Sequence, residues 1–229
     1  MIGLARKFRL LLQSTSGAAL TEFALSAPIL MLAGLWGVET ANQAIVQMRV
    51  NQIAVLIADN AARIGENSLL GESKIYESDI NDVLYGAHVQ GGDKFNFYGN
   101  GRVILSSLEV VPGTEDQQYI HWQRCMGELT SPSHYGYAGD GLDGKLEGMG
   151  PIGEEIIAFK GEAVMFVEVA YVYQPMISQK FTAATTITAT AAFNVRENRD
   201  LSQLYQRDPD TPDAQATCDK HQGVADYYG

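Results

Sequence analysis

Apolar residues form an almost uncharged run near the N-terminus of the chain. Between Ala18 and Val38 the only charged residue is Glu22. Three basic residues precede this run: Arg6, Lys7 and Arg9. A helix rises about 1.5 Å per residue, so the run would span roughly 30 Å, the thickness of the hydrocarbon core of a bilayer. Because cytoplasmic flanks are enriched in Lys and Arg, the pattern predicts a membrane-spanning helix over 18–38 with a cytoplasmic N-terminus.

Helical periodicity continues beyond the apolar run. Aliphatic side chains recur every three or four residues in one stripe: Val46, Val50, Ile53, Ile57, Ala61 and Ile64. Met48 and Val55 fall on nearly the opposite side of the same helix. We therefore expect one helix over 18–64, roughly 70 Å long, whose stripe packs against its own domain. The second apolar side indicates either contact with another molecule or burial within the same domain.

A secretory signal peptide is the alternative explanation of the N-terminal segment. Signal peptides have a shorter apolar core, and a small-x-small cleavage site follows it. No convincing site of that kind follows Val38, and no Gly or Pro interrupts the helical pattern between Gly37 and Gly65. We therefore expect the apolar helix to be retained as an anchor.

Small residues in the apolar run provide a surface for close helix packing. Ala33, Gly37 and Ala41 recur at every fourth position, which would let another helix approach closely. This pattern is weak evidence alone, because Gly and Ala are common in membrane helices. Pro28 lies inside the run, where it removes one backbone hydrogen bond and favours a bend or local unwinding.

The residues after the long helix show one short helical pattern and then strand patterns. Ser78 is a candidate N-cap of a short helix that Gly91 and Gly92 would close. Strand-like segments cover 102–111, 118–125, 163–173 and 185–195. The expected fold is α+β, with the long helix covering one face of a small antiparallel sheet. We expect this domain to occupy 65–195 and an acidic tail to occupy 196–229.

Composition argues against several classes of function. The 229 residues are 46% hydrophobic, enough for about one packed domain outside the membrane segment. A net charge of -11 makes nucleic-acid binding a poor fit. The sequence has no nucleophile elbow, no phosphate-binding glycine loop and no His-Glu metal helix, so we expect neither an enzyme nor a cofactor.

The body contains two cysteines and a loop with several acidic residues, which are the candidate metal ligands of the sequence. Cys125 and Cys218 belong to no C-x-x-C pair and to no Cys–His cluster, which argues against zinc. If the body lies outside the cytoplasm they can form a disulfide, and two unpaired thiols are the alternative. The long loop over 127–161 carries three acids that suggest calcium: Asp140, Asp143 and Glu147. Their spacing does not fit an EF-hand loop, so we expect no metal site.

The start of the apolar run resembles the signature of a known family. The residues from Gly17 to Leu25 read GAALTEFAL, and 27–30 read APIL. This segment is similar to that of TadE-like proteins, the minor pilins or pseudopilins of tight-adherence (Tad) pili within the type IV pilin class. The resemblance implies that a prepilin peptidase cleaves between Gly17 and Ala18 and removes the leader 1–17. It also implies that Glu22, the fifth residue after Gly17, takes part in subunit assembly.

Other segments bear on the same resemblance. The Ala- and Thr-rich segment 186–196, which ends in Arg196, and the aromatic segment 171–175 are similar to strands of the family. Phe23 stands where major Tad pilins carry Tyr, and the chain is much longer than a major pilin, so the resemblance favours a minor subunit. The Asp-x-Ser-x-Ser metal motif of the larger TadG-like relatives does not occur in this sequence.

The resemblance also implies a location and a set of partners. The chain would be a single-pass protein of the inner membrane with a pilin-like body in the periplasm, and it would later reach a pilus at the cell surface that supports adhesion. Its partners would be the prepilin peptidase, other minor pilins, the major Tad pilin and the inner-membrane assembly platform.

Two explanations of Glu22 remain open from the sequence. A carboxylate in lipid is costly unless it is paired. Cleavage after Gly17 would create a free amine at Ala18, which could pair with Glu22 of the same or a neighbouring subunit and set the axial register. Alternatively, Glu22 reaches the lipid headgroups. At the level of function, the alternatives are a signal-anchored periplasmic scaffold or binding protein that never enters a fibre, and a tethered hydrolase, which only the unexplained loop suggests.

Overall fold

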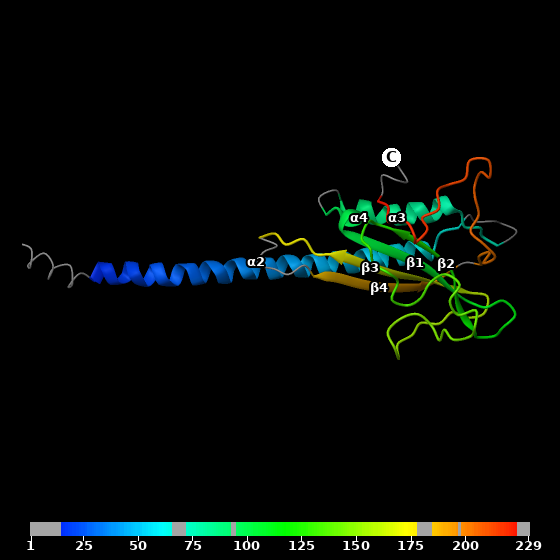
Figure 1. Ribbon diagram of the computed structural model, residues 1–229, viewed down its shortest axis with the longest axis horizontal. Coiled ribbons are helices and arrows are strands. Elements are labelled where there is room, and N and C mark those ends of the chain that lie inside the picture. The colour runs from blue at the N-terminus through cyan, green and yellow to red at the C-terminus, as the bar shows by residue number, and fades with distance from the viewer. Residues whose placement is uncertain (1–14, 66–71, 93–94, 178–184, 197, 224–229) are drawn as a thin grey trace, which may run out of the picture. The chain divides into compact units, whose positions relative to one another are not determined.

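The computed structural model of this chain describes residues 15–65, 72–92, 95–177, 185–196 and 198–223 (Figure 1). The basic residues Arg6, Lys7 and Arg9 lie outside the described residues. The chain divides into two compact units: Met1–Ile45 with Pro175–Ala183, and Val46–Gln174 with Ala184–Gly229. We call the second unit the body.

One long helix carries both the apolar run and the aliphatic stripe. Helix α2 spans Thr15–Ala61 and contains Pro28. The predicted continuous helix is therefore confirmed, although it ends at Ala61 instead of Ile64. A turn follows at Ala62 and Arg63, and Ile64 still packs against the core.

Four strands form a single sheet in the body. They are β1 Gly101–Val110, β2 Gln118–Met126, β3 Ala163–Val172 and β4 Thr186–Asn194. The strand order is β2-β1-β3-β4, and every neighbouring pair is antiparallel. The predicted segments differ from these strands by no more than one residue at either end. The α+β prediction, with a long helix packed on a small antiparallel sheet, is confirmed.

The main hydrophobic core lies between the sheet and two helices. The stripe of α2 is fully buried there at four positions: Val50, Ile53, Ile57 and Ala61. Helix α3, Glu77–Gly91, adds Ile80 and Leu84, and the sheet adds alternate residues of β1 and β3 such as Val103 and Val167. Each fully buried Val, Leu or Ile side chain contributes about 1.5–3 kcal/mol of transfer free energy.

The opposite face of the sheet is covered too. There Leu108, Val164 and Phe166 pack with Met149 and Ala158 of the 127–161 loop. Figure 1 shows this loop on one side of the sheet and α3 on the other. Strands β1 and β3 are consequently buried along almost their whole length. The expectation of cover on one face alone was wrong, because Met149 and Ala158 of the 127–161 loop pack on the other face.

The start of α3 also differs from the sequence prediction. The helix begins at Glu77, so Ser78 lies within the helix and is not its N-cap. Asp79 provides the acceptor instead, because its carboxylate accepts a hydrogen bond from the Tyr76 amide at 3.0 Å. The predicted end is confirmed, since Gly92 has a φ of 72° and donates its amide to the His88 carbonyl. The short helix α4, Phe97–Asn100, was not predicted.

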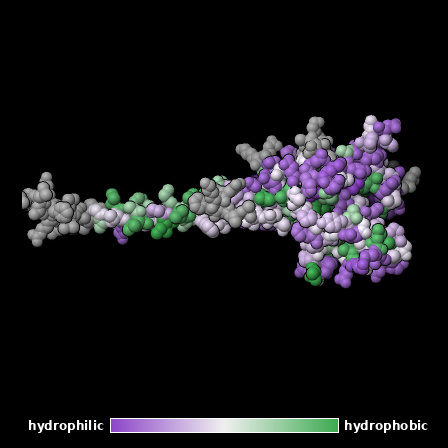
Figure 2. Space-filling view, viewed as in Figure 1, coloured by the Kyte–Doolittle hydropathy of each residue, from purple (hydrophilic) through white to green (hydrophobic). Residues whose placement is uncertain are grey.

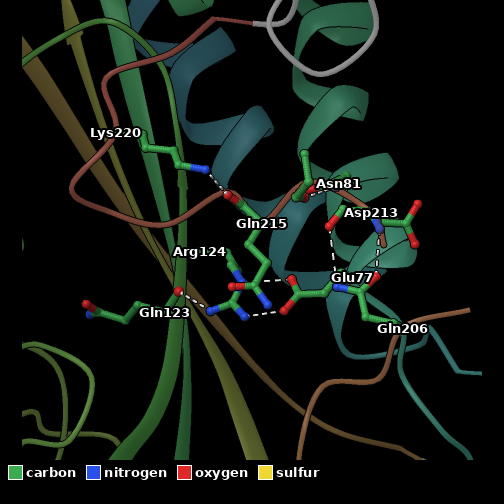
Figure 3. Close-up of polar contacts among 9 residues, drawn as sticks. Glu77, Asn81, Gln123, Arg124, Gln206, Asp213, Gln215 and Lys220 are labelled. Carbon is green, nitrogen blue, oxygen red and sulfur yellow. Dashed lines mark hydrogen bonds and ion pairs between the residues drawn. The ribbon is translucent and has the colours of Figure 1, made fainter. Parts of the chain in front are cut away.

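The described part of the C-terminal segment, 198–223, packs on the rest of the body with isolated bridges but no helix or strand of its own. In Figure 3, Asn81 of α3 donates its side-chain amide to the Ala214 carbonyl at 2.8 Å. The side chain of Gln206 accepts from the Asp213 amide at 2.7 Å within the same segment. Isolated backbone hydrogen bonds, such as that from the Tyr205 amide to the Ile75 carbonyl at 2.8 Å, and these side-chain contacts together satisfy the backbone of this segment without a continuous ladder.

Two arginines of the sheet make polar contacts that hold parts of the body together, and one of them, Arg102, is buried. Arg102 of β1 is 2% exposed and donates to the carbonyl oxygens of Cys218 at 2.6 Å and Lys220 at 3.1 Å. Arg124 of β2, which is partly exposed, forms an ion pair with the buried Glu77 of α3, with Nε 2.8 Å from Oε2 (Figure 3). Removing one partner of such a pair would leave an uncompensated buried charge.

Candidate functional site

The apolar half of α2, 17–45, exposes its apolar side chains on all sides. Phe23 is 70% exposed, Leu25 75% and Trp36 70%. Figure 2 shows green, hydrophobic residues along this segment. Among the described residues, α2 is the one helix that is long and apolar enough to cross a membrane by length and composition. Such a surface is unfavourable in water, so the segment requires lipid or another apolar partner.

The predicted cleavage and assembly residues lie together at the beginning of this helix. Gly17 and Ala18 are both exposed, and no atom lies within 4 Å of where a Gly17 side chain would begin. Glu22 and Phe23 follow one turn later, also exposed. Within the described part of the chain, no hydrogen bond or ion pair reaches the Glu22 carboxylate. The carboxylate is therefore free to pair with a group outside the described residues or on another chain.

The predicted packing ladder lies on the same half of α2. Ala33, Gly37 and Ala41 are spaced by four residues along the helix, and all three are exposed. A side chain added at Gly37 would meet no atom within 4 Å, so this surface remains open to a second helix. Pro28 is exposed and lies within the helix.

Glu39 is a residue of this unit that sequence reasoning did not single out. It is only 8% exposed, and its carboxylate accepts a hydrogen bond from the Ile177 amide at 3.1 Å. Its position directly after the apolar run was visible in the sequence. Its burial was not, because the covering segment lies far away in the chain.

The two cysteines form a disulfide that fixes the C-terminal segment to β2. Cys125 and Cys218 are bonded at an S–S distance of 2.04 Å and are separated by 93 residues. The Cys125 amide also donates to the Ala216 carbonyl at 2.6 Å. Structural disulfides persist in oxidising compartments outside the cytoplasm.

The three acids that suggested calcium lie apart in the structure. Asp140 accepts a hydrogen bond from the Tyr137 amide at 2.7 Å. Asp143 pairs with Lys145 at 2.6 Å, and this hydrogen bond lowers the pKa of the carboxyl group. The described residues contain no group of three or more His, Cys, Asp or Glu side chains that could hold a metal ion. Asp140 and Asp143 therefore stabilise turns of the loop, and Glu147 is exposed.

A buried polar cluster in the body combines a serine, a glutamate and a histidine: Ser107, Glu109 and His121. Ser107 donates to Glu109 Oε1 at 2.6 Å, and His121 Nδ1 lies 3.1 Å from both carboxylate oxygens. Burial, followed by the neighbouring Glu109, raises the pKa of Tyr119 to about 12. A serine nucleophile requires a base that accepts its proton, usually a histidine that a carboxylate orients. Here the Ser107 hydroxyl donates to the Glu109 carboxylate, and Ser107 is 1% exposed. The cluster therefore lacks the geometry of a serine nucleophile, and its hydrogen bonds stabilise the fold.

A second polar cluster lies on the opposite face of the sheet. Glu168 is 5% exposed, and it accepts hydrogen bonds from the Ser133 hydroxyl and from the His134 amide, the latter at 2.8 Å. A hollow of about 240 Å³ adjoins it, lined in part by Thr188 and Thr190. The carboxylate is satisfied by the 127–161 loop, so its evident role is to hold that loop on the sheet.

Comparison with known proteins adds no assignment. The chain matches no protein-family model, and searches of curated proteins and of solved structures gave no significant match.

Proposed function

We propose that this chain is a TadE-like minor pilin, or pseudopilin, that takes part in assembly of a Tad pilus at the inner membrane and so supports adhesion. The single observation that carries the proposal is the arrangement of Gly17 and Glu22 at the start of a membrane-length helix whose surface is apolar on every side. In this proposal a prepilin peptidase removes 1–17, and the helix then holds the body at the membrane.

The membrane topology of the proposal draws on two features. Basic residues before the apolar run favour a cytoplasmic N-terminus. The Cys125–Cys218 disulfide supports a periplasmic body, because such bonds are rare in the cytoplasm. The assembly motor would extract the chain from the membrane into the fibre, where it would meet other minor pilins and the major pilin.

Glu22 has a specific role in the proposed assembly. Its carboxylate, free within the described residues, would pair with the new Ala18 amine of the same or a neighbouring subunit. The pairing offsets the desolvation of both charges in the helix bundle, and it fixes the axial register because only one offset between helices brings the two groups together. The exposed ladder of Ala33, Gly37 and Ala41 would allow close contact between the helices.

The test is N-terminal mass spectrometry of the protein from native membranes, combined with one variant pair. We expect the protein to begin at Ala18, and we expect Glu22→Ala to abolish piliation while the protein still enters the membrane. Ser26→Ala, one turn further along the same exposed segment, is the matched control and should leave piliation intact. Recovery of chains that begin at Met1, in cells with an active prepilin peptidase, would overturn the proposal in favour of a signal-anchored scaffold or binding protein.

A further inference from the structure

The two edge strands of the sheet, β2 and β4, differ in how far the rest of the body covers their outer backbone groups. The outer side of β2 is covered by the chain itself: the Ile120 amide donates to the Asp140 carbonyl at 2.9 Å, and the Cys125 amide donates to the Ala216 carbonyl at 2.6 Å. The outer side of β4 has no such cover among the described residues, where β3 is its only neighbour in the sheet. An edge of this kind presents a row of backbone donors and acceptors to another strand.

The register of β4 with β3 shows which backbone groups of β4 point away from the sheet. The Tyr173 amide donates to the Thr185 carbonyl, and the Val195 amide donates to the Ala163 carbonyl, each at 2.9 Å. In an antiparallel ladder the odd-numbered residues of β4 therefore point their backbone groups toward β3. The even-numbered residues point theirs outward: Thr186, Thr188, Thr190, Ala192 and Asn194.

Strand β4 has none of the features by which sheet edges usually avoid pairing. Its sequence, TITATAAFN, contains no charged residue and no proline. Its register with β3 runs without a bulge, whereas the β1–β2 pair has one between Ser107 and Leu108. A neutral edge on a chain with a net charge of -11 is a region where a neighbouring backbone can approach without strong repulsion.

An apolar groove lies beside this edge. It has a volume of about 600 Å³, and its lining includes Met48, Val55 and Leu56 of α2 and Phe193 of β4. Met48 is 55% exposed and Val55 48%, so the second apolar side of the helix remains uncovered within the described chain. Polar residues border the groove: Asn51, Gln52 and Asp59. A strand added to β4 would direct every second side chain toward this groove.

We propose that β4 accepts an extended, uncharged segment of a different polypeptide as a fifth strand of the sheet, with aliphatic or aromatic side chains of that segment in the groove beside Phe193. A β-strand would satisfy the row of outward backbone groups, and apolar side chains at alternate positions of that strand would fill the groove. The inference uses only the body, so it stands or fails separately from pilus assembly.

A second copy of the chain fits this site less well. If two β4 strands paired fully in antiparallel register about Thr190, Phe193 of one copy would lie opposite Ile187 of the other. Ile187 is 4% exposed and already part of its own core, and the intervening residues on that side are Ala189 and Ala191, which are too short to fill the groove. Pairing would also bring together two chains that each carry a net charge of -11.

The test uses the full chain in detergent micelles and amide hydrogen exchange resolved to single residues. The probe is a capped nine-residue peptide in which threonine alternates with valine and leucine, and the control is the same peptide with alternate amides N-methylated. We expect the probe to bind saturably and to slow exchange at Thr188, Thr190 and Ala192 by about tenfold or more. Ala189 and Ala191, already bonded to β3, should change little, and the methylated peptide should have no effect.

Two variants separate the edge from the fold. Thr190→Lys places a charge on the proposed edge, and Thr130→Lys places the same charge on an exposed loop as the control. We expect Thr190→Lys to weaken binding of the probe by roughly tenfold or more and Thr130→Lys to leave binding unchanged, with the unfolding midpoint of each variant measured alongside to show that it is folded. Val55→Ser, in the groove, should also weaken binding.

Three results would overturn the proposal. One is the absence of saturable binding by the probe. Another is protection located away from β4. The third is protection of the even-numbered amides in the free protein that grows with protein concentration, because this would identify a second copy as the occupant.

Discussion

The two halves of α2 are both apolar, but the structure buries a stripe of apolar side chains in one half and leaves those of the other half exposed. Between Val46 and Ala61 the aliphatic side chains form one stripe, and the structure buries that stripe against the sheet. Between Gly17 and Ile45 the apolar residues surround the helix, and Glu39 is the only residue in this range that the structure buries. In one helix, the apolar stripe of 46–61 is therefore covered by the body, whereas the apolar surface of 17–45 is left exposed.

This difference shows that hydrophobicity and burial are separate properties of a sequence. The spacing of apolar residues indicates how many sides of a helix need cover: one side in the body half, every side in the apolar half. A polypeptide of this size can cover one side with a sheet, whereas covering all sides requires either several helices or a lipid bilayer. The apolar half therefore depends on its surroundings for stability, and the body half depends on the fold.

The largest expected contrast comes from placing the same charge in each half. Ile53→Asp buries an unpaired carboxylate in the core and should destabilise the body by about 4 kcal/mol or more, enough to unfold many domains. Ile29→Asp should leave the unfolding of the body unchanged. It should instead weaken membrane insertion by about 2.5–3.5 kcal/mol, because the residue lies near the middle of the apolar run.

Chemical denaturation, followed by the fluorescence of Trp122 in the body, measures the first effect, and an insertion assay in microsomes measures the second. Trp36 contributes to the signal and should be replaced by Phe in all proteins compared. A loss of body stability in Ile29→Asp as large as that in Ile53→Asp would show that the two halves are not independent.

A smaller contrast is expected within the body half of the helix. Ile57 is fully buried, so Ile57→Ala removes core contacts and should lower the free energy of unfolding by about 2–5 kcal/mol. Val55 is 48% exposed, and Val55→Ala should change the free energy of unfolding by no more than about 0.5 kcal/mol. The measurement is urea unfolding of both variants in the same detergent. Equal losses would mean that the Val55 side of the helix is also buried in solution.

The elements that could be predicted from sequence are those with a local periodic signal. The stripe of α2 and the strand-like segments gave the helix, all four strands and the α+β class, because a period of 3.6 or 2 is visible without knowledge of distant residues. Ser78 was wrong as an N-cap, since Asp79 competes for the same helix end and its carboxylate reaches the free amide.

Other features depend on contacts between distant residues and left no local signal. The cover of Glu39 by Ile177, the ion pair between Glu77 and Arg124, and the packing of Met149 under the sheet all join segments far apart in the chain. The roles of Gly17, Ala18, Glu22 and Phe23 were predicted from a motif, and they stay predictions, because the group that would pair with Glu22 is created only by cleavage and assembly.

Alkaline pH provides the smallest expected contrast between the halves. The pKa of Tyr119 is raised to about 12, first by burial and then by the neighbouring Glu109, whereas tyrosine in an unfolded chain titrates near about 10. The folded state therefore holds the Tyr119 proton more tightly than the unfolded state. The resulting stabilisation is complete below about pH 10 and is lost as the pH rises through about 12. The apolar run 18–38 contains no Lys, Tyr or Cys, so none of its side chains titrates in this range.

We therefore expect the body to lose stability between about pH 10 and 12, and to lose it less steeply in Tyr119→Phe, which has no proton to release. Over the same range both proteins should remain in the membrane pellet if lipid covers the apolar half of α2 as proposed, because the side chains of the run 18–38 keep their charge state. The measurement combines thermal unfolding with sedimentation of membranes at each pH. Identical pH slopes for the two proteins would show that another group controls the alkaline unfolding. Release of the folded chain into the supernatant would show that the apolar half is covered by protein and not by lipid.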